Sequence, residues 1–352
     1  MADTIRVREG EDFDLEAVER QIRENIEGVP EGNLEVRQFP SGASNLTYLV
    51  KIGSWEAVLR RPPLGPVPPK AHDMGRESRI LTKLHEAFPL APKPYFFTDD
   101  ESIIGAPFYV MERREGVIID AQFPEDIELT EELYRGISRT AADTLVELHA
   151  VDWREAGLGE IGRPEGFLER QVGGWIKRYE AAKTDEIEES GPLTDWLAKD
   201  IPESPEPTII HNDYKLNNLV LNPKDLTEVR AVLDWEMATI GDPLFDLAVS
   251  LSYWVEEGDS RELREVLPTV TEASGFMSRR EFVDYYAEKS GRDLSQMHWY
   301  MVFGYFKLAV ILQQIYARWH KGQTKDERFA NFNERVRNLI LHAHDLSKKE
   351  DL

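Results

Sequence analysis

The first third of the chain alternates apolar and polar residues in short runs, whereas helical spacing dominates after Gly116. The alternation predicts strands, because side chains of a half-buried strand point in turn to the core and to solvent. Strands are expected at residues 34–39, 46–52, 55–60, 95–97 and 108–112. Apolar residues at helical spacing predict one helix before Pro30 and another over about residues 73–88. This part of the chain should therefore form a small, mixed or mostly antiparallel β lobe.

The rest of the chain is predicted to be mainly helical. Apolar positions recur at the spacing of amphipathic helices over residues 129–151, 297–319 and 329–344. Two short apolar runs, at residues 209–210 and 219–221, have the length of buried strands. The expected fold class is α+β with two lobes, a small β lobe at residues 1–114 and a larger, mainly helical lobe at residues 115–352.

Composition indicates a globular protein without a membrane span. Hydrophobic residues make up 41% of the 352 residues, and no run approaches the length of about eighteen apolar residues that a spanning helix needs. The first residues have neither a basic start with an apolar core nor an Arg- and Ser-rich, acid-poor character. No secretory or organellar signal is therefore expected, and a cytoplasmic location is the resulting expectation.

Cysteine content and charge exclude several kinds of chemistry. The chain contains no cysteine, which excludes disulfides, thiol nucleophiles, zinc thiolates and iron–sulfur clusters. The formal net charge of −23 disfavours nucleic acid and anionic membranes as partners, because phosphate groups would be repelled. The same acidity indicates either a solvated surface or attraction of a cationic substrate.

A polar loop between the two short apolar runs carries the strongest candidate chemistry. It reads His211-Asn212-Asp213 and then Asn218, with the spacing H-x-D-x-x-x-x-N. The catalytic loop of kinases has the same interval between a catalytic Asp and a metal-binding Asn. His211 is interpreted as structural support, which holds the loop by packing or hydrogen bonding. The interval predicts a phosphotransfer site.

Residue types in and after this loop indicate a role for each. Asp213 is expected to accept the proton of a substrate hydroxyl, and Lys215 to offset charge on the transferring phosphoryl group. Asp234 follows a predicted strand at residues 229–233, so together with Asn218 and phosphate oxygens of ATP it would complete a Mg²⁺ site. The alternative is a pair of acidic turns attached to unrelated strands.

With these segments the chain resembles the aminoglycoside phosphotransferase and choline-kinase group of small-molecule kinases. Asp234-Trp235-Glu236 is similar to that family's D-W-E, and residues 241–248 are similar to its G-D-P-x-x-D-L-A. The similarity covers nearly the whole chain and points to the branch found fused to acyl-CoA dehydrogenases. It implies a protein-kinase-like fold in which the β lobe binds the nucleotide and the helical lobe supplies catalytic and substrate-binding residues. It also implies that Asp246 braces the catalytic loop, with a helix N-terminal acid as the alternative.

The resemblance assigns nucleotide-binding residues in the β lobe. Ser41-Gly42-Ala43-Ser44-Asn45 resembles the loop that covers the phosphates, and an ordinary hairpin turn is the alternative. Arg60 falls where the third strand holds the ATP phosphates, a position that is Lys in protein kinases, and Arg61 is the neighbouring alternative.

Three further residues complete this nucleotide-binding set. Glu77 matches the helix glutamate that pairs with the phosphate-holding base, and a solvated helix acid is the alternative. Met111 and Glu112 lie where the interlobe strand offers backbone hydrogen bonds to adenine.

For the acceptor site, the sequence offers six aromatic residues that could form one wall of a binding pocket or, alternatively, pack in the core. The candidates are Trp175, Tyr179, Tyr253, Trp254, Tyr300 and Tyr305.

The residue set predicts an ATP- and Mg²⁺-dependent kinase that transfers the γ-phosphate to a hydroxyl of a small molecule. The acyl-CoA dehydrogenase branch suggests a hydroxyacyl compound, while aminoglycosides, choline and sugars remain open. The alternative is a catalytically silent, kinase-like module that binds nucleotide. A protein kinase is disfavoured because no A-P-E segment follows Asp234. The sequence does not determine the acceptor, the preference between ATP and GTP, or the oligomeric state.

Overall fold

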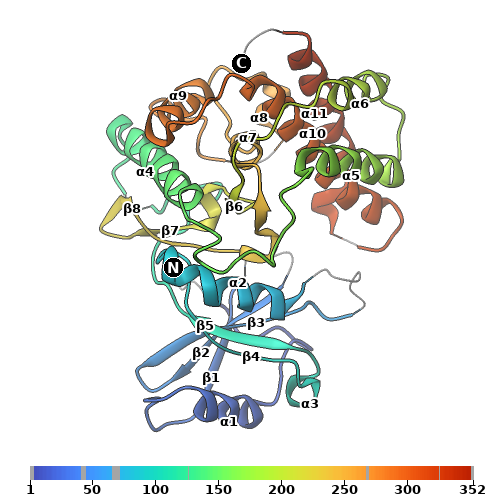
Figure 1. Ribbon diagram of the computed structural model, residues 1–352. Coiled ribbons are helices and arrows are strands. Elements are labelled where there is room, and N and C mark those ends of the chain that lie inside the picture. Colours follow the sequence, from blue (N-terminus) through green and yellow to red (C-terminus); the bar gives the residue numbers. More distant parts are fainter. Residues whose placement is uncertain are drawn as a thin grey trace. The chain divides into compact units, whose positions relative to one another are not determined.

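The computed structural model describes residues 4–40, 45–65, 72–125, 127–266, 269–324 and 326–349. The chain divides into two compact units (Figure 1). Unit 1 comprises Met1–Glu115, Ala156–Ile161 and Arg230–Met237. Unit 2 comprises Gly116–Glu155, Gly162–Val229 and Ala238–Leu352. Unit 1 holds an antiparallel sheet and unit 2 is mainly helical, so the predicted α+β class, with a small β part and a larger helical part, is confirmed.

The sheet of unit 1 has the strand order β1-β2-β3-β5-β4, and its neighbouring strands all pair antiparallel. Its strands are β1 (Glu35–Gln38), β2 (Leu46–Ile52), β3 (Trp55–Arg61), β4 (Pro94–Thr98) and β5 (Phe108–Glu112). Strands β2 and β3 meet at Gly53-Ser54, where Gly53 adopts a φ of 58°. Such a left-handed residue matches the twist of a tight hairpin. The five predicted strands are confirmed.

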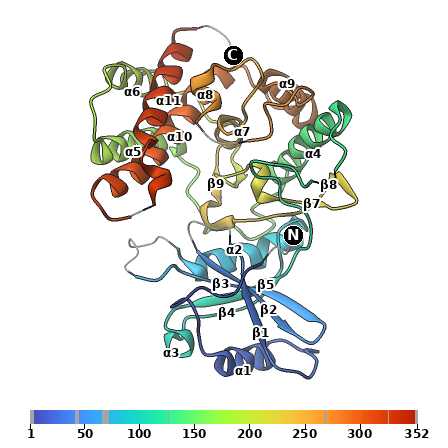
Figure 2. The ribbon, with the colours of Figure 1, turned by 180° about the vertical axis from the view of Figure 1, so that it is seen from behind.

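Helices cover both faces of this sheet, α1 (Leu15–Asn25) on one and α2 (Met74–Ala87) on the other (Figures 1 and 2). The α1 face buries Val18 and Ile22 completely, against Tyr48 and Leu59 of the sheet. Burial of each aliphatic side chain contributes roughly 1.5–3 kcal/mol. Asp14 caps the start of α1 by accepting a hydrogen bond from the backbone, and a short helix, α3 (Glu101–Ile104), precedes β5.

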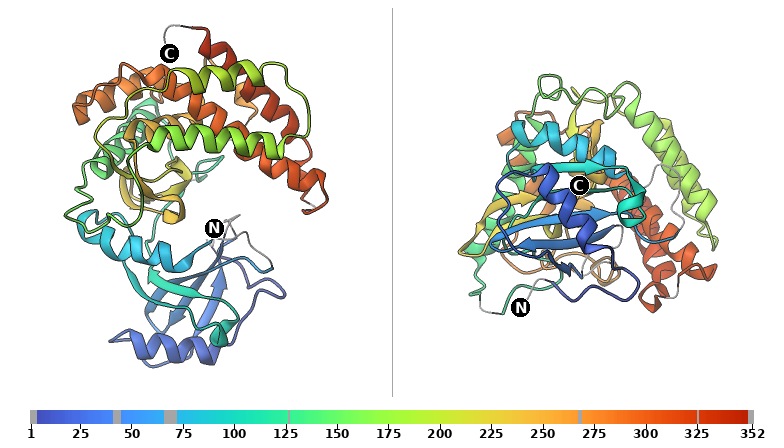
Figure 3. Two further views of the ribbon diagram at one scale, coloured as in Figure 1. Left: turned by 45° about the vertical axis from the view of Figure 1, so that its right-hand side comes forward. Right: turned by 90° about the horizontal axis from the view of Figure 1, so that it is seen from below.

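Unit 2 is built around one long buried helix, α10. Its helices are α4 (Glu131–His149), α5 (Phe167–Ala182), α6 (Ser190–Lys199), α7 (Pro243–Ser252), α8 (Arg261–Arg264), α9 (Arg279–Ser290), α10 (Met297–His320) and α11 (Phe332–Ser347), with a 3₁₀ turn at Glu327–Phe329. Helix α10 contacts α5, α7 and α11, and Figure 3 shows the green pair α5 and α6 alongside the red pair α10 and α11. The predicted amphipathic character of α10 was wrong, because its residues 299–310 are all buried.

Two small antiparallel pairs of strands hold the polar loop that carries the candidate chemistry. Strand β6 (Thr208–Ile210) pairs with β9 (Thr239–Gly241), and β7 (Leu219–Asn222) neighbours β8 (Asp225–Val232). The loop runs from the end of β6 to the start of β7 and includes a 3₁₀ turn at Leu216–Asn218. Because β9 leads directly into α7, the pairing of β6 with β9 brings the start of α7 beside the start of the loop.

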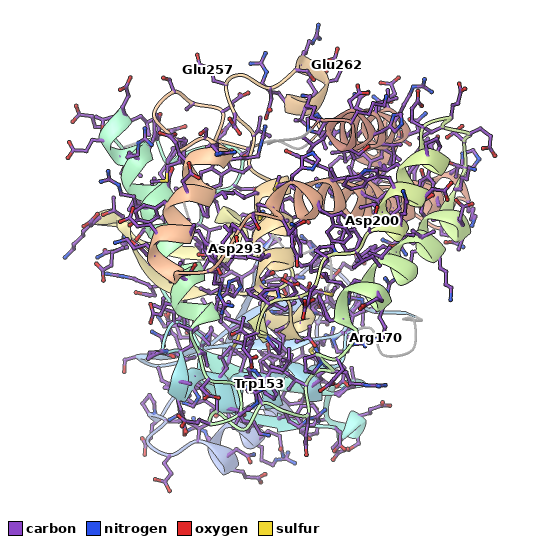
Figure 4. All side chains as sticks on the ribbon, turned by 45° about the horizontal axis from the view of Figure 1, so that its top comes forward. Trp153, Arg170, Asp200, Glu257, Glu262 and Asp293 are labelled. Carbon is purple, nitrogen blue, oxygen red and sulfur yellow. The ribbon has the colours of Figure 1, made fainter. Side chains whose placement is uncertain are left out.

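Exposed acidic side chains are found around unit 2. Figure 4 labels four of them, together with Trp153 and Arg170. The acidic four are Asp200, Glu257, Glu262 and Asp293, and all are exposed. The net charge of −23 therefore lies in part on a solvated surface. Within the described ranges, no helix combines the length and the apolar character needed to span a bilayer.

Candidate active site

The backbone at the start of the loop is held by the fully buried carboxylate of Asp246, which lies in the first turn of α7. Its Oδ2 accepts a hydrogen bond from the backbone N–H of His211 at 2.8 Å, and its Oδ1 accepts one from that of Asn212 at 2.6 Å. Asn212 adopts a left-handed φ of 67°. A non-glycine residue in this region costs on the order of 1 kcal/mol and persists only when its surroundings hold it. Asp246 therefore fixes a strained turn immediately before Asp213.

Asp246 is in turn held by His149, which is itself held by Tyr286, and neither residue was predicted from the sequence. Nε2 of His149 lies 3.1 Å from Oδ2 of Asp246, and Nδ1 of His149 lies 2.7 Å from the hydroxyl of Tyr286. Burial lowers the pKa of His149, so the neutral ring donates from Nε2 to the carboxylate and accepts from the tyrosine at Nδ1. Burial would raise the pKa of Asp246, but the hydrogen bonds that its carboxylate accepts from His149 and from the backbone N–H of His211 outweigh burial and hold that pKa low. No spacing pattern in the sequence marks His149 or Tyr286.

The carboxylate of Asp213 lies between two other residues of the loop. Its Oδ2 is 2.9 Å from Nζ of Lys215 and accepts a hydrogen bond from Nδ2 of Asn218 at 3.2 Å. Nδ2 of Asn218 also donates to the backbone carbonyl of Asp213 at 2.8 Å, and the backbone N–H of Asp213 donates to Nδ1 of His211 at 3.3 Å. The side chain of Asp213 is 22% exposed. A held and still accessible carboxylate can act as a base toward a bound hydroxyl.

Lys215 joins Asp213 to a cavity in unit 2. Its ammonium lies 4.9 Å from the ring centre of Tyr253, a cation–π contact. Burial raises the pKa of the Tyr253 hydroxyl, and the negative charge of Asp213 adds to this effect. Lys215 and Tyr253 line a cavity of about 320 Å³. Its apolar wall consists of Ile119, Leu216, Trp254, Leu308, Ile311 and Leu312.

Two of the six predicted aromatic residues, Tyr253 and Trp254, line this cavity. The other four do not line it and are buried in unit 2, as the core alternative expected. They are Trp175, Tyr179, Tyr300 and Tyr305.

In unit 1, the structure brings Arg60, Glu77 and Asp234 together. Nη1 of Arg60 lies 2.9 Å from Oε1 of Glu77, and its Nη2 lies 3.1 Å from Oδ1 of Asp234. Burial raises the pKa of Glu77 to about 7, the positive charge of Arg60 opposes that rise, and the carboxylates of Asp234 and Glu236 add to it. The Nε atom of Arg60 is buried and has no partner among the described residues. A guanidinium with an unsatisfied donor suits an anionic ligand such as phosphate.

Asp234 itself has an unusual backbone and a partly exposed carboxylate. It follows β8 in the chain with a left-handed φ of 70°, and its side chain is 32% exposed. The carboxylate of Asp234 and the amide oxygen of Asn218 are both ligands of the kind that Mg²⁺ prefers. Because Nδ2 of Asn218 donates to Asp213, its Oδ1 is directed away from that carboxylate. Each of these two oxygens, taken by itself, is a donor whose chemistry suits a divalent cation such as magnesium.

Asn45 contributes to a second polar cluster in unit 1. Its Nδ2 donates to Oε2 of Glu236 at 2.8 Å, and its Oδ1 lies 2.9 Å from Nδ1 of His72. Glu236 was not among the predicted site residues, although the D-W-E segment contains it. Residues 41–44 of the predicted phosphate-covering loop lie outside the described residues, and they include the predicted site residues Ser41, Gly42 and Ser44.

The alternative phosphate base, Arg61, has different surroundings. Its Nη2 donates to the backbone carbonyl of Glu11 at 2.9 Å, and its guanidinium lies 5.5 Å from the ring centre of Tyr48. It therefore contributes to the packing of the α1 face of the sheet.

Met111 and Glu112 end β5, which runs between β3 and β4. The backbone N–H of Glu112 donates to the carbonyl of Lys93 at 2.8 Å, and the carboxylate of Glu112 pairs with Arg114 at 2.9 Å. This N–H is therefore already used within the sheet and is not available for the predicted hydrogen bond to adenine.

The site residues form two sets. The set in unit 1 comprises Arg60, Glu77 and Asp234. The set in unit 2 comprises Asp213, Lys215, Asn218 and Asp246. A model of the phosphotransferase enzyme family matches residues 35–298. The chain belongs to this family. The match includes both sets, from the strand that carries Arg60 to the segment that contains Asp246.

The curated relatives are longer proteins named for a different activity. Acyl-CoA dehydrogenase family member 11 of Gallus gallus is 34% identical over 98% of this chain and 45% of its own length. The protein of the same name from Mus musculus is 36% identical over 93% of this chain and 42% of its own length. The chain therefore spans less than half the length of these relatives.

Solved structures show the same fold. A protein of Ralstonia eutropha JMP134 assigned to the aminoglycoside phosphotransferases is 29% identical, with a TM-score of 0.81 over 96% of this chain and 99% of that one. Choline kinase of Cryptosporidium parvum Iowa II is 15% identical, with a TM-score of 0.65 over 95% and 96% of the two chains. The aminoglycoside phosphotransferase APH(4)-Ia, solved with ADP and hygromycin B, is 17% identical, with a TM-score of 0.58 over 92% and 97%. The predicted resemblance, including the branch found with acyl-CoA dehydrogenases, is confirmed.

Proposed function

We propose that the chain is an ATP- and Mg²⁺-dependent kinase that phosphorylates a hydroxyl of a small molecule. The observation that carries this proposal is the environment of Asp213. Its carboxylate follows a turn fixed by Asp246, lies against Lys215 and Asn218, and remains partly exposed. The fold of structures solved with ADP or AMP-PNP supports a nucleotide as the phosphate donor.

We propose that unit 1 holds the nucleotide through Arg60. Its buried guanidinium is oriented by Glu77 at 2.9 Å and retains an unsatisfied Nε donor. The oxygen ligands proposed for Mg²⁺ are Asn218 and Asp234, on the residue types and spacing in the sequence. When bound, this ion would neutralise charge on the phosphate oxygens.

In the proposed reaction, Asp213 accepts the proton of the acceptor hydroxyl. The hydroxyl oxygen forms a bond to the γ-phosphorus as the bond between that phosphorus and the leaving oxygen of ADP breaks. Lys215 offsets negative charge on the transferred group, and its contacts with Asp213 and Tyr253 hold its ammonium at the edge of the cavity. The products are ADP and a phosphomonoester.

The cavity beside Lys215 favours an acceptor whose hydroxyl is carried by an aliphatic chain. Its wall is largely apolar, and the charged residues among its described lining are one acid, Asp120, and one base, Lys215. A polycationic aminoglycoside would find little compensating charge there. A hydroxyacyl compound fits this lining, and the names of the curated relatives support an acyl substrate.

The expected cytoplasmic location stays a prediction.

The test is a screen of the purified chain with ATP and Mg²⁺. The panel contains hydroxyacyl-CoA thioesters and free hydroxy acids of several chain lengths, choline, sugars and aminoglycosides, and mass spectrometry detects a phosphorylated product. Phosphorylation of a hydroxyacyl compound, lost in Asp213→Asn, supports the proposal. Calorimetric binding of ATP without any product across the panel supports the alternative, a catalytically silent nucleotide-binding module.

A further inference from the structure

Lys307 is the only charged residue in the run of residues 301–312, which forms the buried centre of α10. Its side chain is 2% exposed. No carboxylate among the described residues lies within ion-pair distance of its ammonium. A buried ammonium without an ionic partner is costly, because its hydration is lost and no opposite charge replaces it. Packing of α10 alone gives no reason for a lysine at this position.

The ammonium is directed at the backbone of the catalytic loop. Nζ of Lys307 donates to the backbone carbonyl of Asn212 at 2.8 Å. The faces of two rings surround it, Phe245 of α7 at 5.2 Å and Trp175 of α5 at 5.7 Å. Cation–π contacts of this kind partly replace lost hydration. The charge is thus held at one backbone atom of the loop.

Lys307 and Asp246 hold the same strained turn from its two hydrogen-bonding sides. Asp246 accepts from the backbone N–H of Asn212, and Lys307 donates to the carbonyl of that residue. Asn212 has the left-handed φ of 67°, and its carbonyl belongs to the peptide that leads into Asp213. Asp246 thus holds the peptide group before Asn212 and Lys307 the peptide group after it, so removing either partner would release one of them and let the turn relax.

The electrostatic surroundings of Lys307 also include the proposed base. The nearby negative charges are those of Asp213 and Asp246, and the nearby positive charges are those of Lys215 and Arg178. Burial lowers the pKa of Lys307 to about 8, which the two carboxylates oppose. The residue is therefore charged at pH 7 and loses its proton as the pH rises above about 8.

We infer that Lys307 is a positioning residue of the phosphotransfer site, which orients the peptide between Asn212 and Asp213 and supplies positive charge behind the carboxylate of Asp213. The expected effect on kcat rests on the proposed function, whereas the expected effect on the orientation of the peptide does not. The orientation of the peptide can be measured without turnover.

The experiment compares three variants of the full chain. Lys307→Met removes the charge at similar size, and Lys307→Arg keeps it. Gln313→Met is the matched control, because Gln313 is also buried in α10 and donates to a backbone carbonyl, that of Ala182, at 2.9 Å. Amide hydrogen exchange is followed in peptides covering residues 211–218, and kcat, the KM for ATP and the pH profile are measured where an acceptor is known.

Lys307→Met should exchange faster at residues 211–218 than the wild type, whereas Gln313→Met should not. It should also lower kcat by about ten- to a hundredfold, as a small misplacement of a catalytic group does, with the KM for ATP within about twofold of the wild type. Activity of the wild type should fall as the pH rises above about 8, and Lys307→Arg should retain activity there because its guanidinium stays charged.

Unchanged exchange at residues 211–218 in Lys307→Met would overturn the positioning role, whatever the activity. Equal effects of Lys307→Met and Gln313→Met would overturn it as well, because α10 would then act only as packing. If Lys307→Met does not fold, the decision rests on the pH profile of Lys307→Arg, and a profile identical to that of the wild type would contradict the inference. Absence of turnover by the wild type would refute the proposed function and leave the exchange test intact.

Discussion

Arg60 and Arg61 are adjacent in β3, and their guanidinium groups serve opposite faces of the sheet. Arg60 contacts Glu77 and Asp234, whereas Arg61 donates to the carbonyl of Glu11 on the α1 face. Successive side chains of a strand point to opposite faces, so a shift of one residue would exchange the two roles. The structure therefore provides a matched pair for testing the proposed phosphate base.

Replacement of Arg60 by Ala should weaken ATP binding, because the oriented guanidinium is lost and Glu77 is left buried without its partner. The KM for ATP should rise about tenfold or more, the effect of losing a charged hydrogen bond of about 1.5–3 kcal/mol. Arg61→Ala should leave the KM for ATP within about twofold and lower the melting temperature instead. The reverse result, with ATP affinity lost only in Arg61→Ala, would show that the phosphate base has been misassigned.

The cavity beside Lys215 predicts a selective effect on the acceptor. Ile311→Trp should fill part of the 320 Å³ volume and lower kcat/KM for the acceptor by about tenfold or more, without changing the KM for ATP. Ile315→Trp is the control, since Ile315 lies on the same helix and does not line the cavity. Steady-state kinetics with both substrates varied give the answer. A normal acceptor response in Ile311→Trp would exclude this cavity as the acceptor site.

The buried pair of His149 and Asp246 predicts a dependence of stability on acid. Burial lowers the pKa of His149 below its usual value of 6.5, so the unfolded chain takes up this proton first as the pH falls. Stability from the neutral ring is thus present above pH 6.5 and is lost below it, by up to about 1.4 kcal/mol for each pH unit. His149→Gln, which keeps a donor for Asp246, should lose less melting temperature than the wild type between pH 7.5 and 5.5. Parallel losses would show that His149 is not the responsible group.

Lys307 predicts a dependence of the same sign, but at alkaline pH. Because its pKa is about 8 in the folded chain and its usual value is 10.5, its burial costs about 3 kcal/mol at pH 7. This loss of folding free energy is complete below pH 8. It decreases as the pH rises toward 10.5, because the buried lysine then loses its proton before the unfolded chain does. In urea unfolding, the wild type should therefore gain stability relative to Lys307→Met between pH 7 and 9.5. A constant difference between the two proteins would mean that burial does not lower the pKa of Lys307, because the folded and unfolded chains would then both keep this proton over the whole range.

Much of the fold could be predicted because burial imposes a period on the sequence. The five strands of unit 1 and the short strands beside the loop follow alternating or continuous apolar runs. The prediction for α10 was wrong on amphipathic character, because an interior helix has no polar face to mark its period. The single lysine in that apolar run was a signal of a special role that went unused in the prediction.

The candidate site could be predicted only where the spacing along the chain is short. The interval from Asp213 to Asn218 is local, so the sequence alone indicated it. Arg60 and Asp234 are 174 residues apart, and only the fold of unit 1 shows that they are in contact. The left-handed backbone of Asn212 and Asp234 also depends on tertiary contacts, since neither residue type requires it.

The most direct test of the account is the transfer of labelled γ-phosphate from ATP to the acceptor by the wild type and by Asp213→Asn. We predict a labelled phosphomonoester with the wild type in the presence of Mg²⁺. Asp213→Asn should form it about 10²–10⁴-fold more slowly, because the base is lost, while its calorimetric Kd for ATP stays within about twofold. An equal rate of transfer in Asp213→Asn, or a loss of activity explained entirely by weaker ATP binding, would contradict the assignment of Asp213 as the catalytic base.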